Sequence, residues 1–137
     1  MLKAKDIMTR NIITVKRSTP ILEAVELLVE RHITGVPVAE DDMTLAGVLS
    51  ESDLMGLLYR LSEAKDEKVE DFMTAPAVCF DAEESVTEVC NCLIESPFRR
   101  VPITSDGKIV GIISRKDVVK YIVRMMHEPA AVKALDE

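Results

Sequence analysis

The sequence predicts an α/β protein built from two copies of one β-α-β-β-α unit. Three observations support this. Blocks that start at Asp6 and Ile21 align with blocks 65 residues further on, and the block at Leu45 aligns with one 64 residues further on. Each copy contains an apolar pattern of helical period, and each then has two short runs rich in β-branched residues. Similarity at a fixed offset is the signature of a duplicated structural unit.

The first helix expected in each copy is amphipathic. Apolar residues at positions 21, 24, 25 and 28 recur at helical spacing behind the start signal Ser18-Thr19-Pro20. The apolar residues at 86, 89, 90, 93 and 94 do the same behind residues 81–85. Both stretches therefore predict a helix with one buried face.

A hairpin is expected after each helix. The runs "GVPVAE" and "RRVPIT" are followed by turns rich in acidic residues or glycine, and then by "LAGVL" and "KIVGII". Pro37 and Pro102 cannot donate a ladder hydrogen bond, so we expect both prolines at a sheet edge or a strand start.

Each copy ends in a Ser-x-x-Asp frame, "GVLSESD" at 47–53 and "GIISRKD" at 111–117, followed by a second apolar helical pattern. The boundaries predicted are repeat 1 at 1–61, a charged linker at 62–68, repeat 2 at 69–127 and a C-terminal tail at 128–137. Both final helices carry more apolar residues than one buried stripe needs, which favours a homodimer built by them.

Composition narrows the class of protein. The chain of 137 residues is 47% hydrophobic but only 4% aromatic, and its formal net charge is -7. An acidic surface repels nucleic acid and anionic membranes, so neither is an expected partner. We expect a cytoplasmic protein, because no apolar run approaches the roughly 18 residues of a membrane span and the first ten residues lack a signal-peptide core.

The repeated pattern resembles the CBS domain, and the pair of copies resembles a Bateman module. The resemblance rests on "DIMT" and "DFMT", on "GVPV" and "RRVPI", and on the two Ser-x-x-Asp endings, and it covers nearly the whole chain. It implies two CBS repeats packed with pseudo-twofold symmetry. It also implies an adenosine-containing ligand, such as AMP, ADP, ATP or S-adenosylmethionine, in the cleft between the repeats.

The ligand-binding residues are expected mainly in the second copy. A strand that runs into a helix start at Ser114 presents free N–H groups and the positive end of the helix dipole, which together favour an anion. A carboxylate at Asp117 can accept from ribose hydroxyls. The resemblance implies that these two residues contact phosphate and ribose, and that the strand from Ala77 to Phe80 lines the base pocket. The full candidate set is Ser114, Arg115, Asp117, Lys116, Arg99, Arg100, Ala77, Val78, Cys79 and Pro102, with Ser50 and Asp53 in the first copy.

The two frames differ in charge, because Glu51-Ser52 in the first copy becomes Arg115-Lys116 in the second. We expect Arg115 to attract a phosphate that Glu51 would repel, so that one cleft binds the nucleotide and the other does not. The alternative is that Ser-x-x-Asp is only a capping box that holds a helix end without any ligand.

The sequence therefore predicts a non-catalytic regulatory module that requires no cofactor and has an adenine nucleotide as its ligand. Its output would pass to an unidentified regulated protein or through self-association. One alternative is a ligand-free homo-oligomerisation or protein-interaction module. Another is an enzyme, for which Cys79 would need a histidine partner. His32 and His127 are expected at the surface or at helix ends rather than as metal ligands.

Overall fold

The computed structural model describes residues 2–96, 99–128 and 130, which form two compact units. Unit 1 contains the described residues of 1–12, 78–106 and 110–137, and unit 2 contains residues 13–77 and 107–109. The opening segment of each repeat thus belongs to the unit that holds the other repeat's Ser-x-x-Asp frame. The duplication is visible in the structure, but the two units exchange their first segments.

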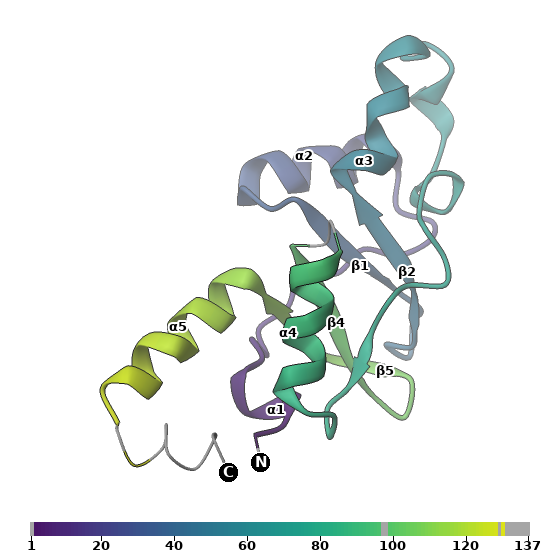
Figure 1. Cartoon of the computed structure of the whole chain (residues 1–137). Coiled ribbons are helices and arrows are strands. Elements are labelled where there is room, and N and C mark those ends of the chain that lie inside the picture. The colour runs from purple at the N-terminus through teal and green to yellow at the C-terminus, as the bar shows by residue number, and fades with distance from the viewer. Residues whose placement is uncertain (1, 97–98, 129, 131–137) are drawn as a thin grey trace. The chain divides into compact units, whose positions relative to one another are not determined.

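Unit 2 contains a long helix, a two-stranded sheet, a short helix and then 3-10 turns (Figure 1). Strands β1 (Gly35–Ala39) and β2 (Leu45–Ser50) pair antiparallel, as the hairpin pattern predicts. The elements of this unit are α2 (Ile21–Arg31), β1, β2, α3 (Glu51–Leu54) and the 3-10 turns η1 (Met55–Tyr59), η2 (Ala64–Asp66) and η3 (Val69–Asp71).

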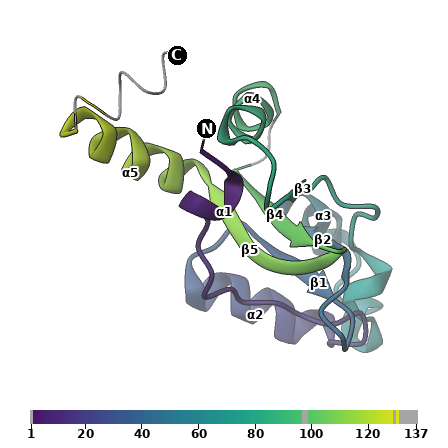
Figure 2. The same ribbon diagram turned by 90° about the horizontal axis from the view of Figure 1, so that it is seen from below.

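Unit 1 contains a three-stranded sheet in the order β3-β4-β5, with β3 parallel to β4. Helix α1 lies close to α4 and to the start of α5, as both views show (Figures 1 and 2). The elements of this unit are α1 (Ala4–Ile7), β3 (Phe80–Asp81), α4 (Val86–Glu95), β4 (Arg100–Ser105), β5 (Lys108–Ser114) and α5 (Arg115–Met126), of which the first residues of β5 count with unit 2.

Three local features differ from the sequence prediction. The strand expected before α2 is reduced to one parallel bridge between Val15 and Val38. The segment expected as a linker contains the turn η2, and Ala64 within it is buried in the core of unit 2. The helix expected after the first frame tightens into 3-10 geometry at Met55.

The two prolines behave differently. Pro37 lies in β1, which pairs with β2 on one side and on the other makes only the single bridge to Val15, where the carbonyl of Pro37 accepts from the Val15 N–H at 3.1 Å. The expectation for Pro102 is wrong, since it lies inside β4, the central strand of three. On the β3 side, the short β3 pairs with β4 only at Ile103 and Thr104, so no ladder bond of that pair needs a donor at position 102.

Each unit has its own aliphatic core. Leu49, Val36 and Val38 are fully buried in unit 2, and Ile103 and Ile113 are fully buried in unit 1. Burial of such side chains is the main favourable term in folding. Across the described part of the chain, no helix combines the length and apolar character needed to cross a membrane.

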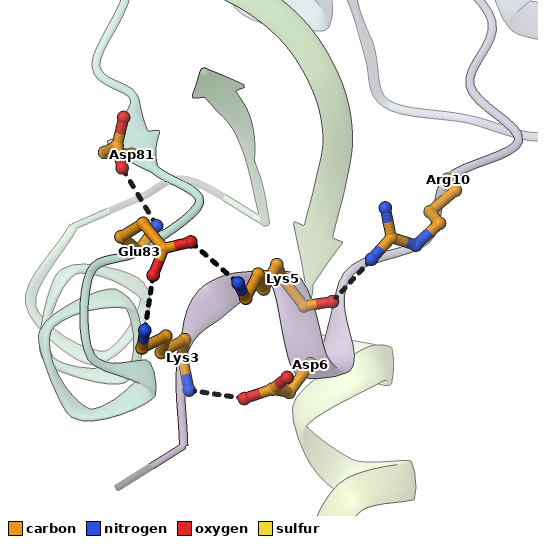
Figure 3. A network of polar contacts seen from close by, with 6 residues as sticks. All are labelled: Lys3, Lys5, Asp6, Arg10, Asp81 and Glu83. Atoms are coloured by element: carbon orange, nitrogen blue, oxygen red, sulfur yellow. Dashed lines mark hydrogen bonds and ion pairs between the residues drawn. The ribbon is translucent and has the colours of Figure 1, made fainter. Parts of the chain in front are cut away.

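A polar network ties helix α1 to the loop after β3 (Figure 3). The ammonium groups of Lys3 and Lys5 donate to the two carboxylate oxygens of Glu83, at 2.5 and 2.7 Å. The Lys3 N–H donates to Asp6, at 2.8 Å, and so caps the helix start. The hydrogen bonds and charges of the two lysines lower the pKa of Glu83 to about 2. The N-terminal segment is therefore anchored to the second repeat.

Candidate functional site

The second Ser-x-x-Asp frame joins the end of β5 to the start of α5. The Ser114 N–H donates to Asp117 Oδ2 at 2.8 Å, and its hydroxyl donates to the same oxygen at 3.0 Å. In return, Ser114 Oγ accepts from the Asp117 N–H at 3.2 Å. The frame is thus a reciprocal capping box, which is the structural role that the sequence had left open.

The other oxygen of Asp117 is held by a residue that sequence reasoning did not single out. Thr9, from the opening segment of the first repeat, donates its hydroxyl to Asp117 Oδ1 at 3.0 Å. The backbones of Thr9 and Ile112 also exchange hydrogen bonds of 2.8 and 3.0 Å. The signal in the sequence is the recurrence of Thr in "DIMT" and "DFMT", although the spacing does not reveal what the threonine contacts.

The first frame repeats this geometry in unit 2. The Ser50 N–H donates to Asp53 Oδ2 at 2.8 Å, and Thr74 donates to Asp53 Oδ1, also at 2.8 Å. Ser50 and Asp53 therefore lie together, as the sequence predicts. Because the two carboxylates have the same hydrogen-bond partners, any difference between the frames must come from the residues around them.

The glycine of each frame leaves space for the exchanged opening segment, which carries Thr9 in one unit and Thr74 in the other. A Cβ placed on Gly47 would lie 2.6 Å from the carbonyl oxygen of Thr74, and one on Gly111 would lie 2.5 Å from the sulfur of Met8. Real Cβ atoms essentially never come this close to a neighbour, so a side chain would force the backbone to shift at Gly47 and the side chain of Met8 to move at Gly111. In both frames the close neighbour belongs to the exchanged segment.

Positive charge beside the second frame comes from Arg100, the first residue of β4. Its side chain is partly buried, and its Nε is fully buried without a hydrogen-bond partner among the described residues. Burial lowers the pKa of the Arg100 guanidinium, whereas the negative charge of Asp117 raises it. The first copy has Gly35 at the corresponding place, so this buried donor is specific to the second frame.

The other basic candidates are more exposed. Arg99 and Lys116 lie at the surface, and the Arg99 carbonyl accepts from the Arg115 N–H at 3.0 Å. The Arg115 guanidinium binds backbone acceptors of another helix, because Nη2 donates to the carbonyls of Leu93 at 3.0 Å and Ser96 at 3.3 Å. Arg115 thus binds the C-terminal end of α4, where a cation also compensates the helix dipole.

The residues expected along the base pocket are divided between the two units. Val78 and Cys79 are exposed just before β3, and Pro102 is buried within β4 of the same unit. Ala77 belongs to unit 2.

Both histidines lie at helix C-caps as predicted, His32 after α2 and His127 after α5. Among residues 2–96, 99–128 and 130, no three His, Cys, Asp or Glu side chains are grouped so that they could hold a metal ion.

A family model described as "CBS domain" matches the chain twice, at residues 4–60 and 69–124. The crystal structure of CBSX2 from Arabidopsis thaliana in complex with AMP is 34% identical, covers 92% of this chain and 99% of that one, and superposes with a TM-score of 0.83. A further structure of CBSX2 gives a TM-score of 0.84, also at 34% identity, over 92% of this chain and 97% of that one.

Curated relatives show the same similarity at the sequence level. The chloroplastic CBSX2 of Arabidopsis thaliana is 32% identical over 90% of this chain and 64% of its own length. An uncharacterized protein of Methanocaldococcus jannaschii is 30% identical over 86% of this chain and 42% of its own length. The chain thus spans about half of the length of these relatives.

Proposed function

Because the chain belongs to the CBS domain family as a tandem pair, we propose that it is a non-catalytic regulatory module that binds an adenine nucleotide or a related adenosyl ligand. AMP, ADP, ATP and S-adenosylmethionine are the candidates. The complex of CBSX2 with AMP supports this class of ligand, since that protein shares 34% identity over 92% of this chain. Binding of the ligand would act either by changing self-association or by changing the interaction with a separate regulated protein.

The observation that carries the proposal is the buried Nε of Arg100, which has no hydrogen-bond partner among the described residues of the unit that also holds Asp117. A buried guanidinium nitrogen without a partner is costly, and a phosphate oxygen would satisfy it. The carboxylate of Asp117 is fixed by Ser114 and Thr9, so it is held ready to accept from a ribose hydroxyl through its remaining lone pairs. The frame at the helix start therefore offers contacts of opposite charge to the two polar parts of a nucleotide.

The remaining candidate residues would contribute to phosphate binding, to contact with the base, or to a weaker second site. Arg99 and Lys116 add positive charge at the surface near the phosphate, and Val78, Cys79 and Pro102 of the same unit contribute apolar contact to the base. Ser50 and Asp53 would form a weaker site, because Glu51 is the residue that follows Ser50 and no arginine replaces Gly35. We propose that the second frame binds the phosphate and that the first does not.

Thermal unfolding of the chain with each of the four ligands tests the proposal. A ligand that binds only the folded state must raise the melting temperature. Calorimetric titration then compares AMP with adenosine in wild type and in Arg100→Ala. We expect Arg100→Ala to lower the affinity for AMP by roughly tenfold or more and to leave the affinity for adenosine almost unchanged, because only AMP carries the phosphate. If none of the four compounds shifts the melting temperature, the proposal is wrong.

The second candidate function is a ligand-free assembly module. It is favoured by the two complete capping boxes, in which each aspartate already has partners for both of its oxygens. The same thermal series separates the two candidates, since an assembly module would show no ligand-dependent shift.

We also propose that the chain forms a homodimer through the helices that follow the two frames. Large apolar side chains are exposed there in both units, among them Leu58 at 71% and Val119 at 57%. Exposed apolar surface of this extent usually marks an interface.

A further inference from the structure

The carboxylate of Asp117 has little acceptor capacity left for a ligand. A carboxylate offers about four lone-pair sites, two on each oxygen. Oδ2 accepts from both the N–H and the hydroxyl of Ser114, at 2.8 and 3.0 Å, and is therefore filled. Oδ1 accepts from the Thr9 hydroxyl at 3.0 Å and keeps one site open. Asp117 can therefore accept one further hydroxyl, but not both hydroxyls of a ribose.

The hydroxyl of Thr9 lies beside this open site and can itself accept a hydrogen bond. Its proton is committed to Asp117, but a hydroxyl oxygen also has two acceptor lone pairs. The bond to Asp117 is its only hydrogen bond with residues 2–96, 99–128 and 130. Thr9 is exposed, and its backbone is fixed by the reciprocal bonds with Ile112 at 2.8 and 3.0 Å. A fixed, accessible acceptor thus lies next to Asp117 Oδ1.

We propose that Thr9 binds the ribose of the ligand, and that Thr9 and Asp117 together select ligands with an intact cis-diol. One ribose hydroxyl donates to Asp117 Oδ1, and the neighbouring hydroxyl donates to Thr9 Oγ1. The two acceptors are 3.0 Å apart, and the two oxygens of a ribose cis-diol are likewise about a hydrogen-bond length apart. This inference rests on the proposed function and names the sugar that the same site requires.

The origin of Thr9 gives this contact a further consequence. Thr9 belongs to the opening segment of the first repeat, whereas Ser114, Asp117 and Arg100 belong to the second repeat, and all four lie in unit 1. A bound ribose would therefore connect the exchanged segment to the frame, in addition to the backbone bonds of Thr9 with Ile112.

Calorimetric titration of the full chain with AMP, 2′-deoxy-AMP and 3′-deoxy-AMP tests the proposal. Wild type should prefer AMP over each deoxy compound by roughly fivefold or more, because each of them lacks one hydroxyl. Thr9→Val keeps the shape of the side chain but loses its hydroxyl, so its preference over one deoxy compound should fall below about twofold. Asp117→Asn should instead lose the preference over the other, because its amide N–H₂ cannot accept a hydrogen bond.

This pair of variants separates direct contact from positioning. If Thr9 only positioned the carboxylate of Asp117, both variants would lose the preference over the same deoxy compound, and the proposal would be wrong. Thr9→Ser keeps the hydroxyl, so it should retain both preferences and an AMP affinity within about threefold of wild type. Full retention of both preferences in Thr9→Val would also contradict the proposal.

The matched control is Thr74→Val, because Thr74 donates to Asp53 in the first frame as Thr9 donates to Asp117 in the second. It should bind AMP like wild type, and circular dichroism checks that every variant is folded. A wild type that binds AMP no better than the two deoxy compounds, or does not bind AMP, would overturn this inference. A wild type that binds none of AMP, ADP, ATP and S-adenosylmethionine would overturn the proposed function itself.

Discussion

The guanidinium of Arg115 binds the end of helix α4, so the charge difference between the two frames has a structural role. The sequence associated Arg115 with a phosphate because it directly follows the frame serine. In the structure its Nη2 atom donates to two carbonyls at the end of α4. In the first repeat, helix α2 ends instead at His32, which has a left-handed backbone conformation. The two repeats thus close corresponding helices in different ways.

The first prediction concerns Arg115. Arg115→Ala should lower the free energy of unfolding by about 1 kcal/mol, because the carbonyls of Leu93 and Ser96 lose a charged donor. The affinity for AMP should change by less than about threefold in both Arg115→Ala and Arg115→Glu. Urea unfolding and calorimetric titration measure the two quantities. A larger loss of affinity in Arg115→Glu than in Arg115→Ala, reduced by salt, would mean that Arg115 contacts the phosphate after all.

The second prediction separates the ligand and capping roles of the aspartates. Asp117→Ala and Asp53→Ala should each cost about 1 kcal/mol of stability, since both remove the same cap. Only Asp117→Ala should also weaken AMP binding, by roughly ten- to a hundred-fold, because a charge-assisted hydrogen bond to the ribose is lost. Each variant is the control for the other. Equal affinities for AMP in the two variants would contradict the assignment of the ligand to the second frame.

At the scale of elements, the exposed ion pairs of Glu83 connect helix α1 to the second repeat. The third prediction follows from its pKa, which falls from 4.5 to about 2 in the folded chain. A lowered pKa means that the stabilisation is present above about pH 4.5 and is lost as the pH falls toward 2. Wild type should therefore be more stable than Glu83→Gln at pH 6, and the two should converge near pH 2.

Thermal unfolding across this range measures the difference, and added salt should reduce it because the pairs are exposed. Glu88→Gln removes the same charge from the exposed side of α4 and serves as a control. A difference between wild type and Glu83→Gln that does not depend on pH would show that the ion pairs do not hold α1.

The fourth prediction concerns the contact between each frame and the exchanged segment. Gly47→Ala should destabilise the chain by about 1–3 kcal/mol, because its Cβ would meet the backbone oxygen of Thr74 at 2.6 Å. Gly111→Ala should cost less, since its closest neighbour is the flexible side chain of Met8. Gly56→Ala is the matched control, because no atom lies within 4 Å of its Cβ. The same cost at all three positions would contradict close packing at the frames.

At the scale of the whole molecule, the fifth prediction is that Leu58→Asp and Ile122→Asp each convert a dimer into a monomer. Both residues are exposed, at 71% and 49%, and they occupy corresponding positions 64 residues apart in the two repeats. A buried, unpaired carboxylate in an apolar contact is costly, so the interface should not form. Light scattering at micromolar concentration measures the mass. Variants that remain dimeric, with unchanged circular dichroism, would place the interface elsewhere.

The sequence by itself determined the duplication, the helices, the hairpins and the two capping frames. These features follow from apolar period, turn residues and cap residues that lie within a few positions of one another. Only the tertiary structure decided that the opening segments are exchanged. Thr9 meets Asp117 across 108 positions of the chain, and no local pattern encodes a contact of that length.

The hydrogen-bond partners of the Arg115 side chain were also decided by the tertiary structure. Its position beside the frame was visible in the sequence, but its partners lie 19 and 22 residues away at the end of another helix. A long side chain binds whichever acceptors the packed helices place within its reach. Local chemistry thus fixed the secondary structure and the frames, while packing between distant segments selected the partners of each charged group.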